Sequence, residues 1–144
     1  MDWKKEAKSE LSKYESLKMS LSNIKDRIQS LEEQKYSLKS SSDDTPVQGG
    51  GCKHEDRLLN ILVEQERLKH TYKANKLRVE LIERGLSALT DVERSVVTEF
   101  ANNRPSIAVN ILSDKIGYER THIYRIYDSA LYKFTIAEYG ISEF

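Results

Sequence analysis

The sequence predicts an all-α protein in which a long antiparallel helical hairpin precedes a three-helix helix-turn-helix domain. Three observations predict it: two long segments repeat apolar residues every seven positions, a Ser/Gly-rich stretch separates them, and two shorter helical patterns meet across a glycine near the end. A content of 32% charged and 38% hydrophobic residues, with 6 Gly and 2 Pro, suits long exposed helices better than a thick core. We expect a coiled-coil domain over residues 1–86 and a helix-turn-helix domain over residues 87–144.

The first heptad pattern covers about residues 4–39. Two series that alternate by three and four residues predict the narrow apolar seam of a coiled coil, which Glu10 and Lys35 interrupt. The series are Ala7, Tyr14, Leu21, Ile28 and Lys35, and Trp3, Glu10, Leu17, Ile24, Leu31 and Leu38.

A connection without apolar periodicity follows over residues 40–53. It contains one proline and three consecutive glycines, so we expect a flexible loop. The glycines do not predict a phosphate-binding loop, because no strand precedes them and no Gly-Lys-Ser/Thr follows.

The second heptad pattern runs from about Glu55 into the eighties. Because the two periodic segments have similar lengths, folding back as an antiparallel hairpin would bury both seams within one chain. Gln65 and Asn75 fall on the seam; either they fix the register by finding partners, or they lie at a hydrated edge. The series are Leu58, Gln65, Tyr72, Val79 and Leu86, and Ile61, Leu68, Asn75, Ile82 and Leu89.

A third helix is expected from Thr90 to about Asn102–Asn103. Thr90 and Glu93 have the spacing of a capping box, in which each side chain satisfies a free backbone amide at the helix start. The apolar face of this helix is Val92, Val96, Val97 and Phe100.

The helix-turn-helix is predicted between Ser106 and Phe134. Ser106 is expected to cap the first helix, Gly117 to end it in a left-handed conformation, and the second helix to begin near Glu119. The expected core comprises Phe100, Ile107, Leu112, Ile116, Ile123, Ile126 and Phe134, and the apolar face of the last helix also includes Tyr127, Ala130 and Ala137.

The opposite face of the last helix carries hydrogen-bonding side chains and is the candidate reader of a DNA groove. Its members are Arg120, Thr121, Tyr124, Arg125 and Asp128, with His122 beside them. We expect Arg125, Lys115 and Lys133 to be better placed for phosphates, and Arg104 belongs to the same local basic patch.

This C-terminal segment resembles the helix-turn-helix of small phage and prophage transcription regulators of the ArpU and RinA kind, which are similar to region 4 of bacterial sigma factors. The resemblance rests on residues 116–118, 124–125 and 130–131 and on Phe134, and the broken coiled coil also resembles the N-terminal half of that group. It implies sequence-specific binding of double-stranded DNA through Arg120, Thr121, Tyr124 and Arg125. Glu119 departs from the pattern, because such domains usually place Ser or Thr there as a cap.

The charge balance tests this implication. From Ser87 onward the chain has six Lys/Arg and eight Asp/Glu, whereas DNA affinity comes largely from neutralising phosphates. We therefore expect binding as a homo-oligomer, with the coiled coil pairing subunits or contacting a partner such as RNA polymerase. The alternative is an interaction adaptor that binds no DNA and whose C-terminal bundle only caps the coiled coil.

Other classes of function have little support in the sequence. A lone cysteine, Cys52, indicates a reducing compartment, and no apolar run has the length of a membrane span, so we expect a cytoplasmic protein. Cys52, His54 and His70 do not form a convincing zinc pattern, and no catalytic set or nucleotide loop is present. We expect no metal, no cofactor and no enzymatic activity.

Overall fold

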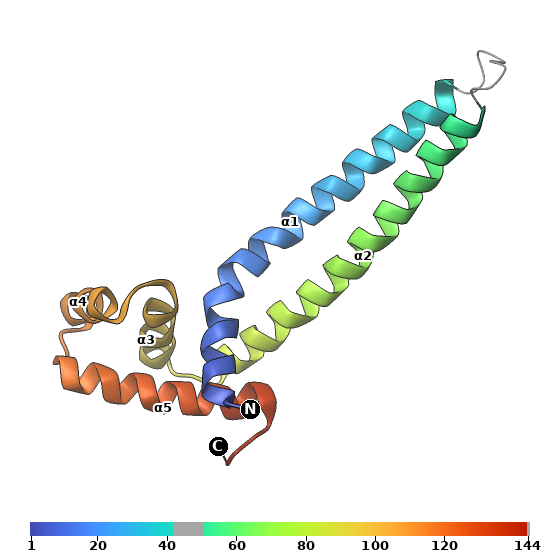
Figure 1. The fold of residues 1–144 in the computed structure, drawn as a ribbon. Helices are drawn as coiled ribbons and strands as arrows, with labels where there is room; N and C mark the ends of the chain where they lie inside the picture. Colours follow the sequence, from blue (N-terminus) through green and yellow to red (C-terminus); the bar gives the residue numbers. More distant parts are fainter. Residues whose placement is uncertain (42–50, 144) are drawn as a thin grey trace. The chain divides into compact units, whose positions relative to one another are not determined.

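The computed structural model describes residues 1–41 and 51–143, and within them the chain is all-α, as predicted. Figure 1 shows the order of the helices, and no strand occurs in these two ranges. The helices are α1 (Trp3–Ser41), α2 (Gly51–Ser87), α3 (Asp91–Asn102), α4 (Pro105–Ile116) and α5 (Arg120–Tyr139).

The long helices extend into both ends of the predicted 40–53 loop. α1 continues to Ser41 and α2 already begins at Gly51, because extending an existing helix over a few weak helix formers costs little per residue. The rest of the predicted loop lies outside the described residues.

The chain forms two compact units. Leu17–Leu77 is one, and Met1–Ser16 together with Arg78–Phe144 is the other. The second unit therefore takes in the first turns of α1 and the last turns of α2 as well as α3, α4 and α5.

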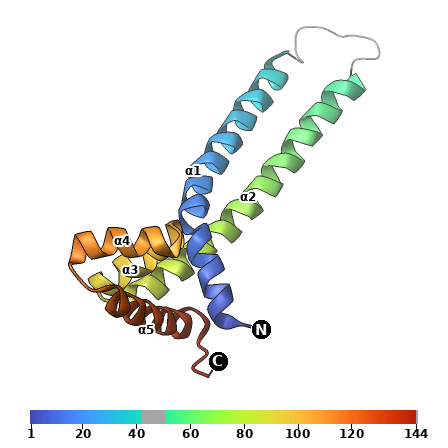
Figure 2. The ribbon, with the colours of Figure 1, turned by 60° about the vertical axis from the view of Figure 1, so that its left-hand side comes forward.

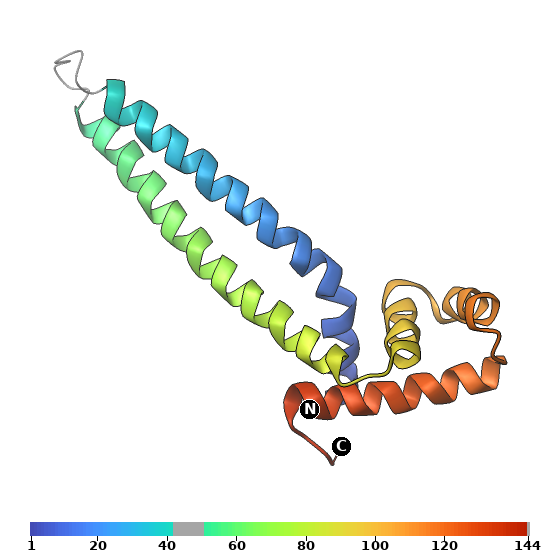
Figure 3. The same ribbon diagram turned by 180° about the vertical axis from the view of Figure 1, so that it is seen from behind.

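In the Leu17–Leu77 unit, α1 and α2 lie side by side and antiparallel, as Figure 3 shows from behind. The side chain of Gln65 contacts Ile28 and Glu32, whereas that of Asn75, further along α2, contacts Ser20, which is earlier in α1. Residue numbers therefore increase in opposite directions along the two helices. All predicted seam positions of this unit are buried or half-buried. The predicted hairpin is confirmed.

The two seam amides find partners across the hairpin. Gln65 is 4% exposed, and its Nε2 donates to the backbone oxygen of Ile28 (3.4 Å) and to Glu32 Oε2 (2.9 Å). The half-buried Asn75 donates from Nδ2 to Ser20 Oγ at 3.2 Å. A hydrated edge is therefore excluded for Gln65, and both amides favour this register. Hydrogen bonds from Gln65 and Lys35 lower the pKa of Glu32.

In the other unit, α3, α4 and α5 pack around a small apolar core (Figure 2). The centre of this core is Val96, Val109, Leu112 and Ile123, with Phe100, Ile116, Tyr124, Ile126 and Tyr127 against it.

Three residues that the sequence places on inner apolar faces are exposed in the structure, so these predictions are wrong. Ile107 is 47% exposed, because it shares an outer row of α4 with Ile111, while Val109 and Leu112 turn inward. Val92, in the first turn of α3, and Ala137, in the last turn of α5, are also exposed. Periodicity identified the inner face of each helix, but not how far along it the neighbouring helices extend.

The start of α1 belongs to the same unit as the helix-turn-helix. The rings of Trp3 and Tyr139 lie 5.1 Å apart, and Lys8 Nζ lies 5.8 Å from the centre of the Tyr127 ring. Leu11, which is outside the predicted seam, is 6% exposed. The first turns of α1 therefore bury a side chain, Leu11, beside the predicted seam as well as the seam residues themselves.

Candidate nucleic-acid interface

The turn between α4 and α5 has the backbone that the sequence predicts. Gly117 ends α4 at φ 80° and ψ 14°, and its amide donates to the backbone oxygen of Ser113 at 2.9 Å. This left-handed conformation suits glycine, which has no Cβ to clash. The three residues from Gly117 to Glu119 separate the helices, which gives a tight helix-turn-helix.

The start of α4 differs from the prediction. Arg104 is the N-cap and Pro105 occupies the first turn, so Ser106 lies inside the helix and is not its cap. Proline fits this position because its fixed φ suits a helix and its missing amide would have no intrahelical partner.

Glu119 is the N-cap of α5, and its side chain makes no capping hydrogen bond. An acidic side chain at this end of a helix is compatible with the helix dipole, but it places negative charge beside the candidate reading residues. The weaker cap expected from the sequence is therefore present.

Most of the predicted reading residues are exposed in the first turns of α5. Arg120, Thr121, His122 and Arg125 all face solvent. Thr121 and Arg125 are one turn apart, so they lie on the same side of the helix. The ring of His122 packs edge-on against that of Tyr118, with centroids 4.7 Å apart.

The sequence predicts an outward position for Tyr124, but in the structure Tyr124 is only partly outward. It is half-buried, and its ring meets Phe100 edge-on with centroids 5.6 Å apart. The guanidinium carbon of Arg120 lies 5.9 Å from the centre of the same ring, within reach of a cation–π contact. Tyr124 thus connects the core to the exposed Arg120.

The predicted phosphate-contacting cations differ in their surroundings. Arg104 and Lys115 are exposed. Lys133, in contrast, forms an ion pair with Glu93 of α3: its Nζ lies 3.1 Å from Oε1 and 3.0 Å from Oε2. The side chain of Lys133 is still 51% exposed, but its charge already has a partner within the domain.

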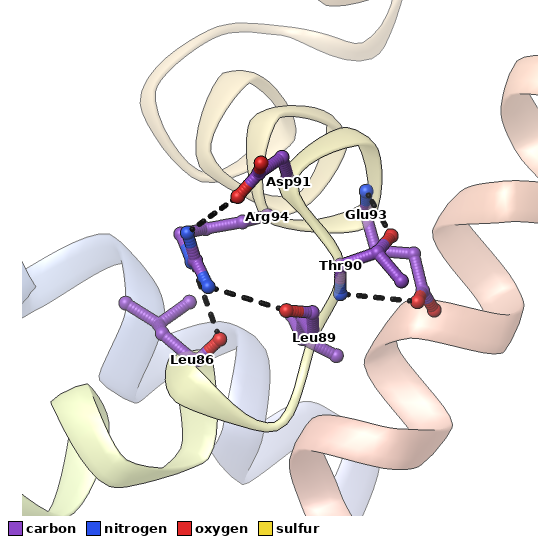
Figure 4. Close-up of polar contacts among 6 residues, drawn as sticks. All are labelled: Leu86, Leu89, Thr90, Asp91, Glu93 and Arg94. Atoms are coloured by element: carbon purple, nitrogen blue, oxygen red, sulfur yellow. Dashed lines mark hydrogen bonds and ion pairs between the residues drawn. The ribbon is translucent and has the colours of Figure 1, made fainter.

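The same Glu93 completes the predicted capping box (Figure 4). Its backbone amide donates to Thr90 Oγ1 at 3.2 Å, and its Oε1 accepts from the Thr90 amide at 3.3 Å. Burial alone would raise the pKa of Glu93, but its hydrogen bonds with Lys133 and Thr90 lower it below the usual value. One ionised carboxylate therefore caps α3 and anchors α5.

Arg94, one of the six basic residues from Ser87 onward, connects the end of α2 with the residues that lead into α3. Its Nε donates to the Leu86 carbonyl oxygen at 3.3 Å and its Nη2 to the Leu89 carbonyl oxygen at 3.2 Å, while Nη1 lies 3.2 Å from Asp91 Oδ1 (Figure 4). An arginine in the first turn of the third helix was visible in the sequence, but nothing there indicated which carbonyls it would meet.

An aromatic cluster supports the base of the candidate interface. The rings of Phe100 and Tyr127 are stacked, with centroids 4.2 Å apart and an angle of 19° between planes. Together with Tyr124 and Leu11 they line a groove of about 520 Å³. Of the five tyrosines near the C-terminus, Tyr124, Tyr127 and Tyr139 are half-buried, so they act at least partly as edge residues of the core.

Two alternative kinds of site find no support within residues 1–41 and 51–143. No group of three or more His, Cys, Asp or Glu side chains there could hold a metal ion. None of the helices in these ranges has both the length and the apolar content needed to cross a membrane.

Comparison of the chain with protein-family models, with curated proteins and with solved structures finds no match. The geometry and the charges of the helix-turn-helix are therefore the basis for a function.

Proposed function

We propose that this chain is a DNA-binding transcription regulator, encoded by a phage or prophage and acting in the cytoplasm, that reads double-stranded DNA with α5. The observation that carries the proposal is the exposure of Arg120, Thr121 and Arg125 in the first turns of a helix that follows a tight glycine turn. In a helix-turn-helix the second helix enters the major groove, and its N-terminal residues contact the base edges.

The proposed roles follow from position and chemistry. Arg120 is placed at the start of α5 and can give two hydrogen bonds to a guanine edge, while Thr121 can bond to either kind of base pair. Lys115 and Arg104 contact phosphates, which fix the position of the domain without reading sequence. Because Lys133 is paired with Glu93, its first role is to hold α5 against α3, and a phosphate contact is secondary.

Because the C-terminal segment is net acidic, one domain alone would neutralise few phosphates, so we propose that two or more domains bind together and add their phosphate contacts. The hairpin is proposed to pair the subunits or to contact RNA polymerase. Exposed apolar side chains on α2, namely Leu59, Leu62 and Val63, support this role because they lie within one turn of each other.

The test is to select preferred sites from a random duplex pool and to compare variants on them. Arg120→Ala should weaken binding to the selected site by about 1–3 kcal/mol and relax the preference at one base pair. Lys115→Ala, the matched control, should weaken binding to all sequences alike. Glu119→Ser should strengthen binding, because it removes a negative charge and supplies a better cap.

The second candidate is an adaptor that binds protein and not DNA, and the same acidic balance favours it. If Arg120→Ala and Glu119→Ser both leave DNA binding unchanged while Ile123→Ala unfolds the domain, α5 is only a structural element. The adaptor would then replace the regulator as the proposed function.

A further inference from the structure

The hairpin carries a concentration of positive charge that the proposed reading helix does not use. Between Glu66 and Glu80, α2 has no acidic residue and five basic ones. Arg67 pairs with Glu64 and Arg78 with Glu10. The basic residues between them are Lys69, Lys73 and Lys76, all of which are exposed.

These three lysines lie in one row. They are spaced by four and three residues, so they lie on one side of α2, rising about 6 and 4.5 Å along the helix axis. Within the described ranges of the chain, none of them forms an ion pair with a carboxylate.

The contact between Gln65 and Glu32 identifies a further lysine on the same side of the hairpin. Lys69 follows Gln65 by one turn of α2, and Lys25 precedes Glu32 by one heptad of α1, so both lie on the side where Gln65 meets Glu32. Lys25 is also exposed and without an ion pair among the described residues. We call Lys25, Lys69, Lys73 and Lys76 the lysine face.

The acidic residues nearest the lysine face along the two helices are Asp26, Glu66 and Glu80. Glu66 lies 3.9 Å from His70, which forms an ion pair with it only when the imidazole is protonated. Glu32 accepts a hydrogen bond from Gln65 and pairs with Lys35 at 3.0 Å, so it does not neutralise the lysine face. Arg67, in contrast, is neutralised locally: it pairs with Glu64, and Arg67 and Arg27 lower the pKa of that carboxyl. The four lysines outnumber the three nearby carboxylates, so the lysine face carries an excess of positive charge.

We propose that the lysine face binds the phosphate backbone of double-stranded DNA without reading its sequence. A row of flexible ammonium groups on a stiff helix suits the regular phosphates of a duplex, and lysine acts as a point charge without the planar fork that recognises guanine. Tyr72, the only Phe, Tyr or Trp among residues 66–80, is half-buried on the seam, whereas single strands are held by stacking on aromatic side chains. Among residues 66–80, all of which the structure describes, Leu77 is the only exposed large apolar side chain, whereas a helix that binds membranes inserts a continuous apolar face beside its basic one.

This surface would supply phosphate contacts that the net-acidic helix-turn-helix lacks. The inference builds on the proposed DNA binding, but it concerns a different surface and is tested on DNA that contains no preferred site. The two proposals can therefore fail separately.

The experiment measures binding of the full chain to a random-sequence duplex over a range of KCl concentrations. The variant is Lys69→Gln, Lys73→Gln and Lys76→Gln combined, in which glutamine keeps the helix propensity and removes three charges. The control is Lys4→Gln, Lys5→Gln and Lys13→Gln combined, which removes three exposed lysines of α1 from another part of the chain. Circular dichroism checks that both variants keep the wild-type helix content.

The slope of log affinity against log salt should become shallower by about 0.9 for each lost contact, or by roughly 2.7 if all three lysines bind phosphates. The control should keep the wild-type slope. A wild-type slope in the Lys69/Lys73/Lys76 variant would overturn the proposal, as would the absence of any binding of the wild-type chain to the random duplex at low salt.

Two further measurements separate the alternatives. If the variant binds DNA normally but loses binding to vesicles of anionic phospholipid, the lysine face binds membranes and the proposal is overturned. If Arg120→Ala leaves the sequence preference unchanged while the lysine variant shows the shallower salt slope, the proposed phosphate binding by the lysine face is supported. The proposed reading of DNA by α5 is then wrong.

Discussion

Gly85 is a helical residue whose small size is required by tertiary packing. It lies in α2, where glycine normally costs about 0.5–1 kcal/mol relative to alanine. A Cβ at this position would lie 2.7 Å from Cε2 and 2.9 Å from Cδ2 of Phe134, whose side chain is fully buried. Glycine therefore lets the Phe134 ring of α5 pack directly on the backbone of α2.

We expect Gly85→Ala to lower the free energy of unfolding by about 1–2 kcal/mol, although the same change in an exposed helix would raise it. The new methyl group must displace a buried ring, and overpacking of this kind costs more than the gain in helix propensity. Chemical denaturation followed by circular dichroism measures the effect.

Two controls test the cause. Ser87→Ala, at an exposed position two residues along α2, should change stability by less than about 0.5 kcal/mol. Combining Gly85→Ala with Phe134→Leu should cost less than the sum of the two single changes, because the shorter side chain leaves room for the methyl group. Strict additivity would contradict the proposed clash.

At the scale of helices, the sequence was sufficient wherever a local rule determines the structure. Heptad spacing identified the seam because coiled-coil contacts repeat along each helix, and Thr90 with Glu93 identified a helix start because the capping box lies within four residues. Gly117 was predictable for the same reason, since the left-handed turn is a local property of glycine.

Contacts that depend on a second packing face could not be predicted in this way. A heptad analysis assigns one apolar face to each helix, so it gave no role to Leu11 or to Gly85. The pairing of Lys133 with Glu93 joins residues 40 positions apart and follows no local pattern. For the candidate reading site, exposure of Arg120 and Thr121 followed from periodicity, whereas the half-burial of Tyr124 depended on where Phe100 lies.

The register of the hairpin is the property of α1 and α2 that we expect a single substitution to alter. Asn75→Leu removes the hydrogen bond to Ser20 and adds apolar surface to the seam. The melting temperature should rise because apolar surface is added to the seam. The pairing of α1 with α2 should become less specific, because leucine packs equally well when the two helices are shifted relative to each other. Thermal melts and the number of backbone amide signals in an NMR spectrum measure the two effects.

The control is Ala74→Leu, which adds a larger apolar side chain at an adjacent exposed position of α2. It should change neither the melting temperature nor the number of amide signals. A lower melting temperature for Asn75→Leu would mean that the bond to Ser20 stabilises the hairpin more than apolar packing could.

At the scale of the whole chain, a carboxylate near the C-terminus faces residues of both long helices. Glu138 of α5 has an Oε2 atom that is buried without a hydrogen-bond partner among the described residues. Burial, and then repulsion from Glu10 of α1, raise the pKa of Glu138 to about 7, although Arg78 of α2 acts in the opposite direction. Arg78 already pairs with Glu10, with 2.8 Å between Nη2 and Oε1. The hydroxyl of Tyr139, the next residue after Glu138, is likewise buried without a hydrogen-bond partner among the described residues.

This arrangement gives folding stability a pH dependence with a definite sign. Below a pH of about 4.5, Glu138 is protonated in both the folded and the unfolded chain. As the pH rises towards 7, the unfolded chain releases this proton while the folded chain retains it, so the free energy of unfolding falls. Above about 7 the loss is complete, and we expect it to amount to about 1–3 kcal/mol.

Glu138→Gln should therefore be more stable than the wild-type chain at pH 7.5 and should lose the decline between pH 5 and 7, because a neutral amide has no proton to release. Glu143→Gln removes the same charge from an exposed position and should leave the decline in place. Urea denaturation at several pH values measures each curve. If the curve of Glu138→Gln parallels that of the wild-type chain throughout this range, Glu138 is hydrated in the folded protein, and another group must account for any pH dependence of its stability.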